Sequence, residues 1–327
     1  MSYSSIRTQI DKENTLSFII PYYNVPIDML KTCIDSILYL SLNPQKREII
    51  LIDDGSDTSP LPHLQAYADK LIYIRLPHTG LSNARNTGIR ISTGKYIQFI
   101  DADDFLLQTP YEHCLDIMRY HHPDIVFFDF TKTYTTNLPL NFEGPIDGTQ
   151  YMRQNNLKAS ACGYLFNRKI LGDLRFRPKI YHEDEEFTPQ LLLRAERVFT
   201  TNAKAYYYRL RNESITRKKD LKNTIKRLTD MESIIKNLRR MADIATQENR
   251  EALQRRVAQL TMDYLYNVIL QTHSLHYLEK CVNRLYMQGF FPLPDKPYTR
   301  KYKWFRRLIA HKWGRKLLCK LLPALPK

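Results

Sequence analysis

Short apolar runs alternate with amphipathic segments along the first part of the chain. Apolar runs bounded by polar or turn residues predict buried strands at Leu16–Pro21, Glu48–Ile52, Leu71–Leu76, Tyr96–Ile100 and Ile125–Phe130. Apolar residues spaced three and four apart predict helices at Ile27–Leu42, Ser82–Ile91 and Tyr111–Tyr120. This alternation indicates an α/β fold with a mainly parallel, Rossmann-like sheet flanked by helices.

The pattern becomes less regular after Gly144. We expect a strand at Cys162–Phe166 and another at Ala203–Leu210. Between them, Glu183–Arg194 reads as a helix entered through acidic residues, which suit the positive end of the helix dipole. After about Leu221 the sequence is helical and polar.

The change of pattern predicts two domains. The α/β domain is expected over residues 1–217, and a mostly helical region with a basic amphipathic tail over residues 218–327.

Four polar clusters follow predicted strands or open a predicted helix. They are Tyr22–Asn24, Asp53–Asp57, Gly80–Arg85 and Asp101–Asp104. Ligands of parallel α/β sheets bind at the carboxyl ends of the strands. We therefore expect the four clusters to form one shared site.

Asp101 and Asp103 end the fourth predicted strand, two residues apart. An extended or turning backbone sends such residues to the same side, so both carboxylates can converge on one ligand. Mg²⁺ and Mn²⁺ prefer oxygen ligands and often take one or two carboxylates together with substrate phosphates. A metal here would bridge a diphosphate. The alternative is a solvated acidic turn.

Asp53 and Asp54 end the second predicted strand, and Gly55 permits a tight turn with positive φ. A carboxylate in this turn can accept hydrogen bonds from a nucleotide base or from ribose hydroxyls. The alternative is an Asx-type turn that caps the next helix.

Arg85 lies in the first turns of the helix that begins after Gly80. Arginine suits bidentate contact with phosphate, and a helix N-terminus adds amide donors. Gly88 would let this helix pack closely on a neighbour. The alternative is a helix cap with a surface arginine.

Four carboxylates are concentrated in His182–Phe187 (HEDEEF). One of them, held near strong negative charge and partly buried, could have a raised pKa and act as a base. The alternative is the acidic first turn of an ordinary helix.

The net charge of +15 calls for an anionic partner, and most of the excess lies in the tail. Residues 300–327 hold ten Lys and Arg and no Asp or Glu. Aromatic and aliphatic residues recur between the basic ones over residues 300–322, a pattern typical of helices that lie on anionic membranes. The alternative is a helix that packs its apolar stripe on the catalytic domain.

The remaining composition predicts a folded cytoplasmic protein. The hydrophobic fraction of 43% is enough for a core, and the five scattered cysteines lack disulfide or metal-ligand spacing. We see neither a secretory leader nor a run of about 18 apolar residues. The expected location is the cytoplasm, with peripheral contact at the inner face of the cell membrane.

The clusters, taken in order, resemble the inverting family 2 glycosyltransferases with the GT-A fold, of the bacterial surface-polysaccharide type. The matching segments cover roughly residues 14–217: IIPYYN (19–24), IDDGSDT (52–58), GLSNARNTGI (80–89), GKYIQFIDADDFL (94–106), HEDEEF (182–187) and YYYRLRNESIT (206–216).

The resemblance implies donor-binding roles for the first two segments. Pro21, Tyr23 and Asn24 would line the pocket for the nucleotide base. Asp53 and Asp54 would hold the base or the ribose. The donor would be a nucleoside-diphosphate sugar, most commonly a UDP-sugar in this family.

The resemblance also implies roles around the diphosphate. Arg85 would lie against the nucleotide or the diphosphate, and Asp101 would contact the ribose. Asp103 would hold Mn²⁺ or Mg²⁺ as the aspartate of the DxD motif. Asp184 would be the general base that deprotonates a hydroxyl of a glycan or lipid-linked acceptor. Arg209 is a further candidate for contact with the diphosphate.

Three other functions remain alternatives at this stage. Nucleotidyl transfer is disfavoured because PYYNVP (residues 21–26) stands where a glycine-rich loop would follow the first strand. Nucleic-acid binding through the positive charge is disfavoured because carboxylates at the strand ends would repel a phosphate backbone. The third alternative is a catalytically inactive GT-A scaffold.

Overall fold

The computed structural model of the protein describes residues 15–134, 139–210 and 220–324. These residues fall into two compact units, of which the first contains Met1–Tyr151 and Lys158–Ser214, and the second Met152–Leu157 and Ile215–Lys327. The predicted domain boundary after residue 217 lies outside the described residues.

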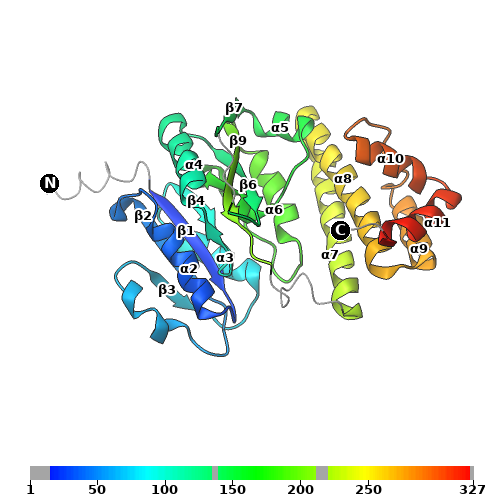
Figure 1. Ribbon diagram of the computed structural model, residues 1–327. Helices are drawn as coiled ribbons and strands as arrows, with labels where there is room; N and C mark the ends of the chain where they lie inside the picture. The colour runs from blue at the N-terminus through cyan, green and yellow to red at the C-terminus, as the bar shows by residue number, and fades with distance from the viewer. Residues whose placement is uncertain (1–14, 135–138, 211–219, 325–327) are drawn as a thin grey trace. The chain divides into compact units, whose positions relative to one another are not determined.

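The first unit is built on one sheet with the strand order β3-β2-β1-β4-β8-β6-β9-β5, and β7 pairs with β9 (Figure 1). The strands are β1 (Leu16–Tyr22), β2 (Arg47–Asp53), β3 (Ile72–Arg75), β4 (Tyr96–Phe99), β5 (Phe105–Leu106), β6 (Ile125–Thr131), β7 (Phe142–Ile146), β8 (Tyr164–Asn167) and β9 (Val198–Tyr207).

The first half of the sheet is parallel, as the sequence predicts. β3, β2, β1 and β4 all run in the same direction. β8 runs antiparallel to both of its neighbours, β4 and β6, while β6 and β9 are again parallel. The predicted α/β architecture is confirmed, and the second half of the sheet is mixed.

The helices of the first unit are α2 (Ile27–Leu38), α3 (Leu81–Ile91), α4 (Gln108–His121), α5 (Gly148–Gln154) and α6 (Glu183–Leu192). α5 continues into the short segment that belongs to the second unit. The connection from β1 to β2 and the connection from β3 to β4 cross the sheet in opposite directions. Because such crossovers are right-handed, α2 and α3 cover opposite faces of the parallel half.

The ends of β1 and α2 differ from the sequence prediction. β1 continues through Pro21 to Tyr22, because beyond Ile19 it pairs with β2 on one side only. A proline is tolerated at such an unpaired edge. α2 ends at Leu38 instead of Leu42, and Arg47 donates hydrogen bonds of 3.0 and 3.1 Å to carbonyls of its last turn.

The sequence prediction misplaces the start of β9 and misses three short elements. β9 begins at Val198, five residues before the predicted start at Ala203. Its first part pairs with β6 and β7, although Thr200, Thr201 and Asn202 interrupt the apolar pattern. The sequence pattern does not predict β5, β7 or α5, because each is short. β5 and β7 depend in addition on pairing with the distant strand β9.

Gly88 lies where α3 approaches β1. A Cβ atom added there would lie 2.2 Å from Cγ2 of Ile19, which is fully buried in β1. The close packing predicted for Gly88 is confirmed.

The methyl group added by Gly88→Ala overpacks the contact with Ile19, which costs about 1–3 kcal/mol of unfolding free energy. The gain in helix propensity returns about 1 kcal/mol. We expect the net result to be a loss of unfolding free energy. Urea unfolding measures the change. Arg90→Ala, on the exposed side of α3, is the control and should stay within about 0.5 kcal/mol of the wild type. A Gly88→Ala protein more stable than the wild type would contradict this packing.

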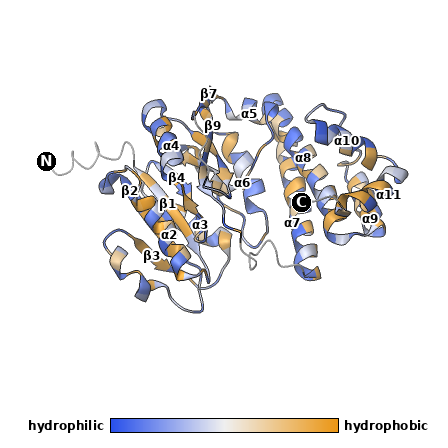
Figure 2. Ribbon diagram, in the orientation of Figure 1, coloured by the Kyte–Doolittle hydropathy of each residue, from blue (hydrophilic) through white to orange (hydrophobic). Residues whose placement is uncertain are grey.

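The second unit is helical, as predicted. Its helices are α7 (Leu221–Ile244), α8 (Gln247–Thr272), α9 (Leu275–Met287), α10 (Arg300–Ile309) and α11 (Lys312–Leu321). Hydrophobic and hydrophilic residues alternate along α7 and α8 (Figure 2), since each helix has a buried and an exposed side. Among the described residues, no helix has the length and apolar character needed to cross a bilayer.

Candidate active site

The strand order of the sheet reverses between β1 and β4. The chain moves from β1 outward to β2 and β3 and then returns to place β4 on the other side of β1. These strands are parallel, so their carboxyl ends lie at one edge of the sheet. A ligand crevice is expected at such a switch point. The segments that follow β1, β2 and β4 are therefore the place to look for a site.

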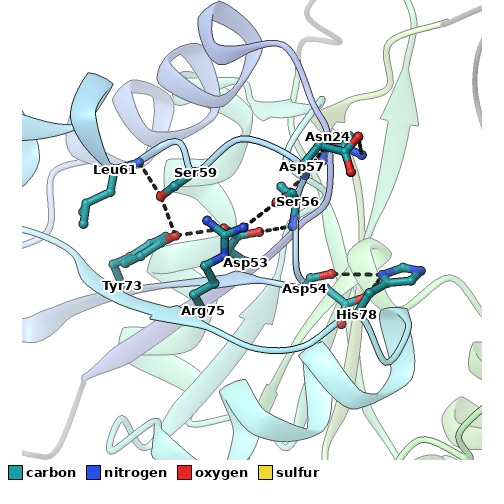
Figure 3. Close-up of polar contacts among 10 residues, drawn as sticks. All are labelled: Asn24, Asp53, Asp54, Ser56, Asp57, Ser59, Leu61, Tyr73, Arg75 and His78. Atoms are coloured by element: carbon teal, nitrogen blue, oxygen red, sulfur yellow. Dashed lines mark hydrogen bonds and ion pairs between the residues drawn. The ribbon is translucent and has the colours of Figure 1, made fainter.

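The segment after β1 is bound to the segment after β2. The backbone N–H of Asn24 donates to Oγ of Ser56 over 3.0 Å, and its side-chain amide donates to Oδ2 of Asp57 over 3.1 Å (Figure 3). Asp57 in turn donates its backbone N–H to Oδ1 of Asn24 over 3.0 Å. Two of the predicted clusters are thus joined.

Asp53 is fully buried at the end of β2. Its carboxylate accepts hydrogen bonds from the backbone N–H of Ser56 at 2.9 Å and the hydroxyl of Tyr73 at 2.8 Å. Nε of Arg75 lies 3.7 Å away (Figure 3). These contacts stabilise the loop after β2.

Asp54 connects the loop after β2 to the start of α3. Its carboxylate accepts 2.8 Å hydrogen bonds from the backbone N–H groups of Thr79 and Gly80, and Gly80 is the N-cap of α3. The ring of His78 lies 2.9 Å from the same carboxylate and stacks on Tyr23, with centroids 4.1 Å apart. The rings of Tyr23 and His78 are both exposed at this corner.

Gly55 has a φ of 73°, which confirms the predicted tight turn. A Cβ atom there would lie 2.6 Å from the backbone nitrogen of His78. Both the conformation and the close approach require glycine at this position.

Arg85 lies buried among groups from four segments. It donates to Oε1 of Glu183 over 2.6 Å and to Oδ1 of Asp101 over 3.2 Å. Its guanidinium lies 5.8 and 5.4 Å from the ring centres of Phe99 and Phe176. Burial by itself lowers the pKa of Arg85, but Glu183 and Asp101 raise it above its ordinary value, so the group stays charged.

The turn after β4 is hydrogen-bonded to β9 and to the residues that follow it. The backbone N–H of Asp101 donates to the hydroxyl of the fully buried Tyr206 over 3.0 Å. Asp104 is buried and accepts the backbone N–H of Arg209 over 2.7 Å. Burial, with the charges of Asp101 and Asp103, raises the pKa of Asp104 to about 8. Of the three carboxylates in this turn, Asp104 is buried and bonded to the backbone, and Asp101 is bonded to Arg85. Asp103 is half-exposed.

Asp184 lies in the first turn of α6, directly after Glu183. Its side chain is half-buried. His182, the N-cap of this helix, has a φ of 62° in the left-handed region. The bond between Glu183 and Arg85 therefore ties the turn that carries Asp184 to the turn after β4.

Arg209 follows β9 beside the same turn. Its guanidinium lies 4.9 Å from the ring centre of Phe105, and Phe105 stacks on Tyr207 with centroids 4.5 Å apart. Pro21 is buried in β1 opposite Ile52. The remainder of the predicted closing segment, residues 211–216, lies outside the described residues.

A divalent cation fits the donor set of this turn. Within residues 15–134, 139–210 and 220–324, no group of three or more His, Cys, Asp and Glu is placed to hold a metal by itself. The turn nevertheless offers carboxylate oxygens at Asp101 and Asp103, and its accumulated negative charge contributes to the raised pKa of Asp104. One or two carboxylates completed by substrate phosphates are a common environment for Mg²⁺.

The structure joins the predicted site residues through three side chains that the sequence did not single out. These are His78, Glu183 and Tyr206. Glu183 could have been suspected from the acidic run that begins α6, since a buried arginine needs such a partner. Tyr206 begins the matching segment at residues 206–216, which is its signal in the sequence. For His78 the sequence holds no signal, because its contacts come from the fold.

The comparisons with known proteins agree with this arrangement. Residues 17–173 match Glycosyl transferase family 2. The chain is 30% identical over 227 residues to the uncharacterized glycosyltransferase YibD of Escherichia coli K12, covering 64% of this chain and 65% of YibD. It is 26% identical over 208 residues to the minor teichoic acid biosynthesis protein GgaB of Bacillus subtilis, covering 60% of this chain and 23% of GgaB.

The fold resembles that of TarS 1-349 from S. aureus in complex with UDP-GlcNAc. The TM-score is 0.61 at 17% identity, over 84% of this chain and 92% of that chain. Residues 17–173 therefore carry a glycosyl transferase family 2 domain, as the ordered motifs predict, and the fold is of the GT-A type. The chain spans less than two thirds of the length of YibD and of GgaB.

Proposed function

We propose that the protein is a metal-dependent inverting glycosyltransferase of surface-polysaccharide synthesis. It transfers a sugar from a nucleoside-diphosphate sugar, a UDP-sugar in the first instance, to a hydroxyl of a glycan or lipid-linked acceptor. The observation that carries this proposal is the position of Arg85. Arg85 binds Asp101 in the turn after β4 and Glu183 in the first turn of α6, next to Asp184. One buried cation therefore connects the turn proposed to hold the metal with the helix turn that carries the candidate base.

The nucleotide occupies the edge of the sheet beyond β1 and β2. Tyr23 and Asn24 offer an exposed ring and amide for the base, with Pro21 behind them. Asp53 and Asp54 act by holding the loops that shape this pocket, since their carboxylates are buried in bonds to protein groups. The similarity to GgaB, a minor teichoic acid biosynthesis protein, supports a surface polymer as the product. The fold similarity to TarS in complex with UDP-GlcNAc supports a UDP-sugar as the donor.

The diphosphate lies at the turn after β4. Asp103 would hold Mn²⁺ or Mg²⁺, with phosphate oxygens completing the coordination. When bound, the ion stabilises negative charge on the departing diphosphate. Asp101 contacts the ribose with the carboxylate oxygen left free by Arg85, and Arg209 contributes positive charge beside the diphosphate.

Asp184 acts as the general base. Its carboxylate takes the proton of the acceptor hydroxyl as the hydroxyl oxygen bonds to the anomeric carbon. The bond from that carbon to the diphosphate breaks on the opposite face, and the nucleoside diphosphate leaves with the electron pair. A single displacement inverts the anomeric configuration and needs no covalent enzyme intermediate.

Arg85 is a positioning residue in this scheme. It lies too deep to bind an exposed diphosphate, with only 4% of its side chain exposed. It holds the carboxylate of Asp101 and the start of α6 in fixed positions, which keeps donor and base aligned.

The cytoplasm is the proposed location. All five cysteines are free thiols, and four of them are buried. Unpaired thiols are typical of a reducing compartment.

Calorimetric titration with UDP, GDP, CDP and ADP, with and without Mn²⁺, tests the donor site. We expect one diphosphate, UDP first, to bind in the presence of Mn²⁺. Asp103→Asn should weaken that binding by at least about tenfold, because the metal loses its carboxylate. Asp116→Asn, which removes an exposed carboxylate bound to Arg119 on α4, is the matched control and should bind like the wild type.

Two results would contradict the proposal. One is a folded wild-type protein that binds none of the four diphosphates. The other is equal binding by Asp103→Asn and the wild type, which would remove Asp103 from the metal site.

A further inference from the structure

α10 and α11 already use one side of each helix to pack within the second unit. Tyr302, Phe305 and Ile309 of α10 are buried, as is Leu318 of α11. The two helices contact each other and α8, and α11 also contacts α9. Part of the apolar stripe expected from the sequence is thus buried within the second unit. The large apolar residues that remain exposed to solvent need another explanation.

The outer side of α11 carries such residues. Trp313, Leu317 and Leu321 are 62%, 39% and 50% exposed. Lys316 and Lys320, also exposed, lie between them. The five positions are spaced three, four, seven and eight residues from the first, so they form one stripe along the helix.

The outer side of α10 repeats this composition. Trp304 is 67% exposed. Arg300, Lys303 and Arg307 are exposed at helical spacing around it. Both tryptophans of the chain therefore lie on the outer sides of these two helices.

The basic side chains of these stripes are not neutralised. Residues 296–327 contain no Asp or Glu. The arginines that do form ion pairs are Arg306, with Asp295, and Arg315, with Glu279. Lys312, at the start of α11, is exposed as well. Within the described part of the chain, Lys312 and the exposed cations of the outer stripes have no ion pair; these cations are Arg300, Lys303, Arg307, Lys316 and Lys320.

We propose that the outer sides of α10 and α11 bind the surface of an anionic membrane. Tryptophan is enriched at the membrane interface, and lysine and arginine are attracted to anionic headgroups. Leu317 and Leu321 gain by entering the acyl boundary. A second copy of the chain would bring like charges together, and a nucleic acid would leave the two leucines in water. This binding is separate from the donor site and does not depend on it.

The intrinsic fluorescence of the full chain gives a direct test, because its two tryptophans are the ones in question. We expect a blue shift and co-sedimentation when vesicles of phosphatidylcholine with 30% phosphatidylglycerol are added at low salt. Pure phosphatidylcholine vesicles should bind far more weakly, and salt should weaken the anionic binding.

Variants then assign the surface. Lys312→Gln with Lys316→Gln and Lys320→Gln should weaken vesicle binding by about 100-fold at low salt. Lys70→Gln with Lys132→Gln and Lys222→Gln removes the same charge from exposed lysines elsewhere and should change binding by less than about threefold. Leu317→Ser with Leu321→Ser should weaken binding by about tenfold and leave UDP binding unchanged.

Three results would overturn the proposal. The first is unchanged tryptophan emission and no co-sedimentation with anionic vesicles. The second is equal loss of binding in the two triple variants, which would mean a response to net charge alone. The third is tight, lysine-dependent binding of duplex DNA under conditions in which the vesicles do not bind.

Discussion

Replacing Asp184 by asparagine is expected to lower kcat by about 10³-fold, within the range that a positioned general base contributes. The amide keeps the size of the side chain but cannot accept a proton from the acceptor. UDP binding in the presence of Mn²⁺ should stay close to that of the wild type. Initial rates of UDP release with a responsive acceptor, together with calorimetry, measure both effects.

Glu185→Gln is the matched control for this experiment. It makes the same chemical change one residue further along α6, at a position without a proposed role. We expect its kcat to remain within about threefold of the wild type. An Asp184→Asn enzyme with near-normal turnover would exclude Asp184 as the base, and a Glu185→Gln enzyme with a 10³-fold loss would move the base to the next carboxylate.

Replacing Arg85 by methionine should have the largest effect on stability. Glu183 would be left as a buried charge without its partner, which costs about 3–5 kcal/mol of unfolding free energy. The double variant Arg85→Met with Glu183→Met removes both charges and should recover most of that loss. Urea unfolding of the two variants measures the difference.

Activity should respond differently from stability. In the double variant Asp101 has no guanidinium to hold it, and the first turn of α6 is no longer tied to the turn after β4. We expect kcat/KM to remain at least about 100-fold below the wild type even where stability returns. A double variant that recovers both stability and activity would reduce Arg85 to a structural role.

Arg284 offers a structural control in the second unit. It lies 2.7 Å from the buried Glu232, so Arg284→Met also leaves a buried carboxylate without this partner. Glu232 keeps Lys236 at 2.9 Å. We expect a smaller loss of unfolding free energy, about 1–3 kcal/mol, and unchanged kcat/KM. Loss of activity here would show that stability alone controls turnover.

Local chemistry explains why so much of the fold could be predicted. The strands β1, β2, β4 and β6 and the helices α3 and α4 lie where apolar runs and helical spacing placed them. Gly55 and Gly88 have the turn and the close packing that their lack of a side chain permits. The parallel half of the sheet follows from this alternation, because parallel strands need a crossover between them.

The internal use of the polar residues could not be predicted in this way. A carboxylate at a strand end can bind a ligand, cap a loop or pair with a buried cation, and its own neighbours in sequence do not distinguish these uses. Asp54 is bound to Thr79 and Gly80, 25 and 26 positions away. Asp104 accepts a hydrogen bond from the backbone N–H of Arg209, 105 positions away.

The sequence by itself determined the α/β class and the order of the motifs, because these depend on local periodicity and residue type. The resemblance to family 2 glycosyltransferases rests on that order, and residues 17–173 match the family. Only the tertiary structure decided that Arg85 is buried against Glu183, 98 positions away, and that Asp104 is the buried carboxylate of the turn after β4 while Asp101 and Asp103 stay half-exposed. It also decided which apolar residues of α10 and α11 are exposed to solvent. Burial and partner choice are properties of packed surfaces, and such surfaces exist only after distant segments have come together.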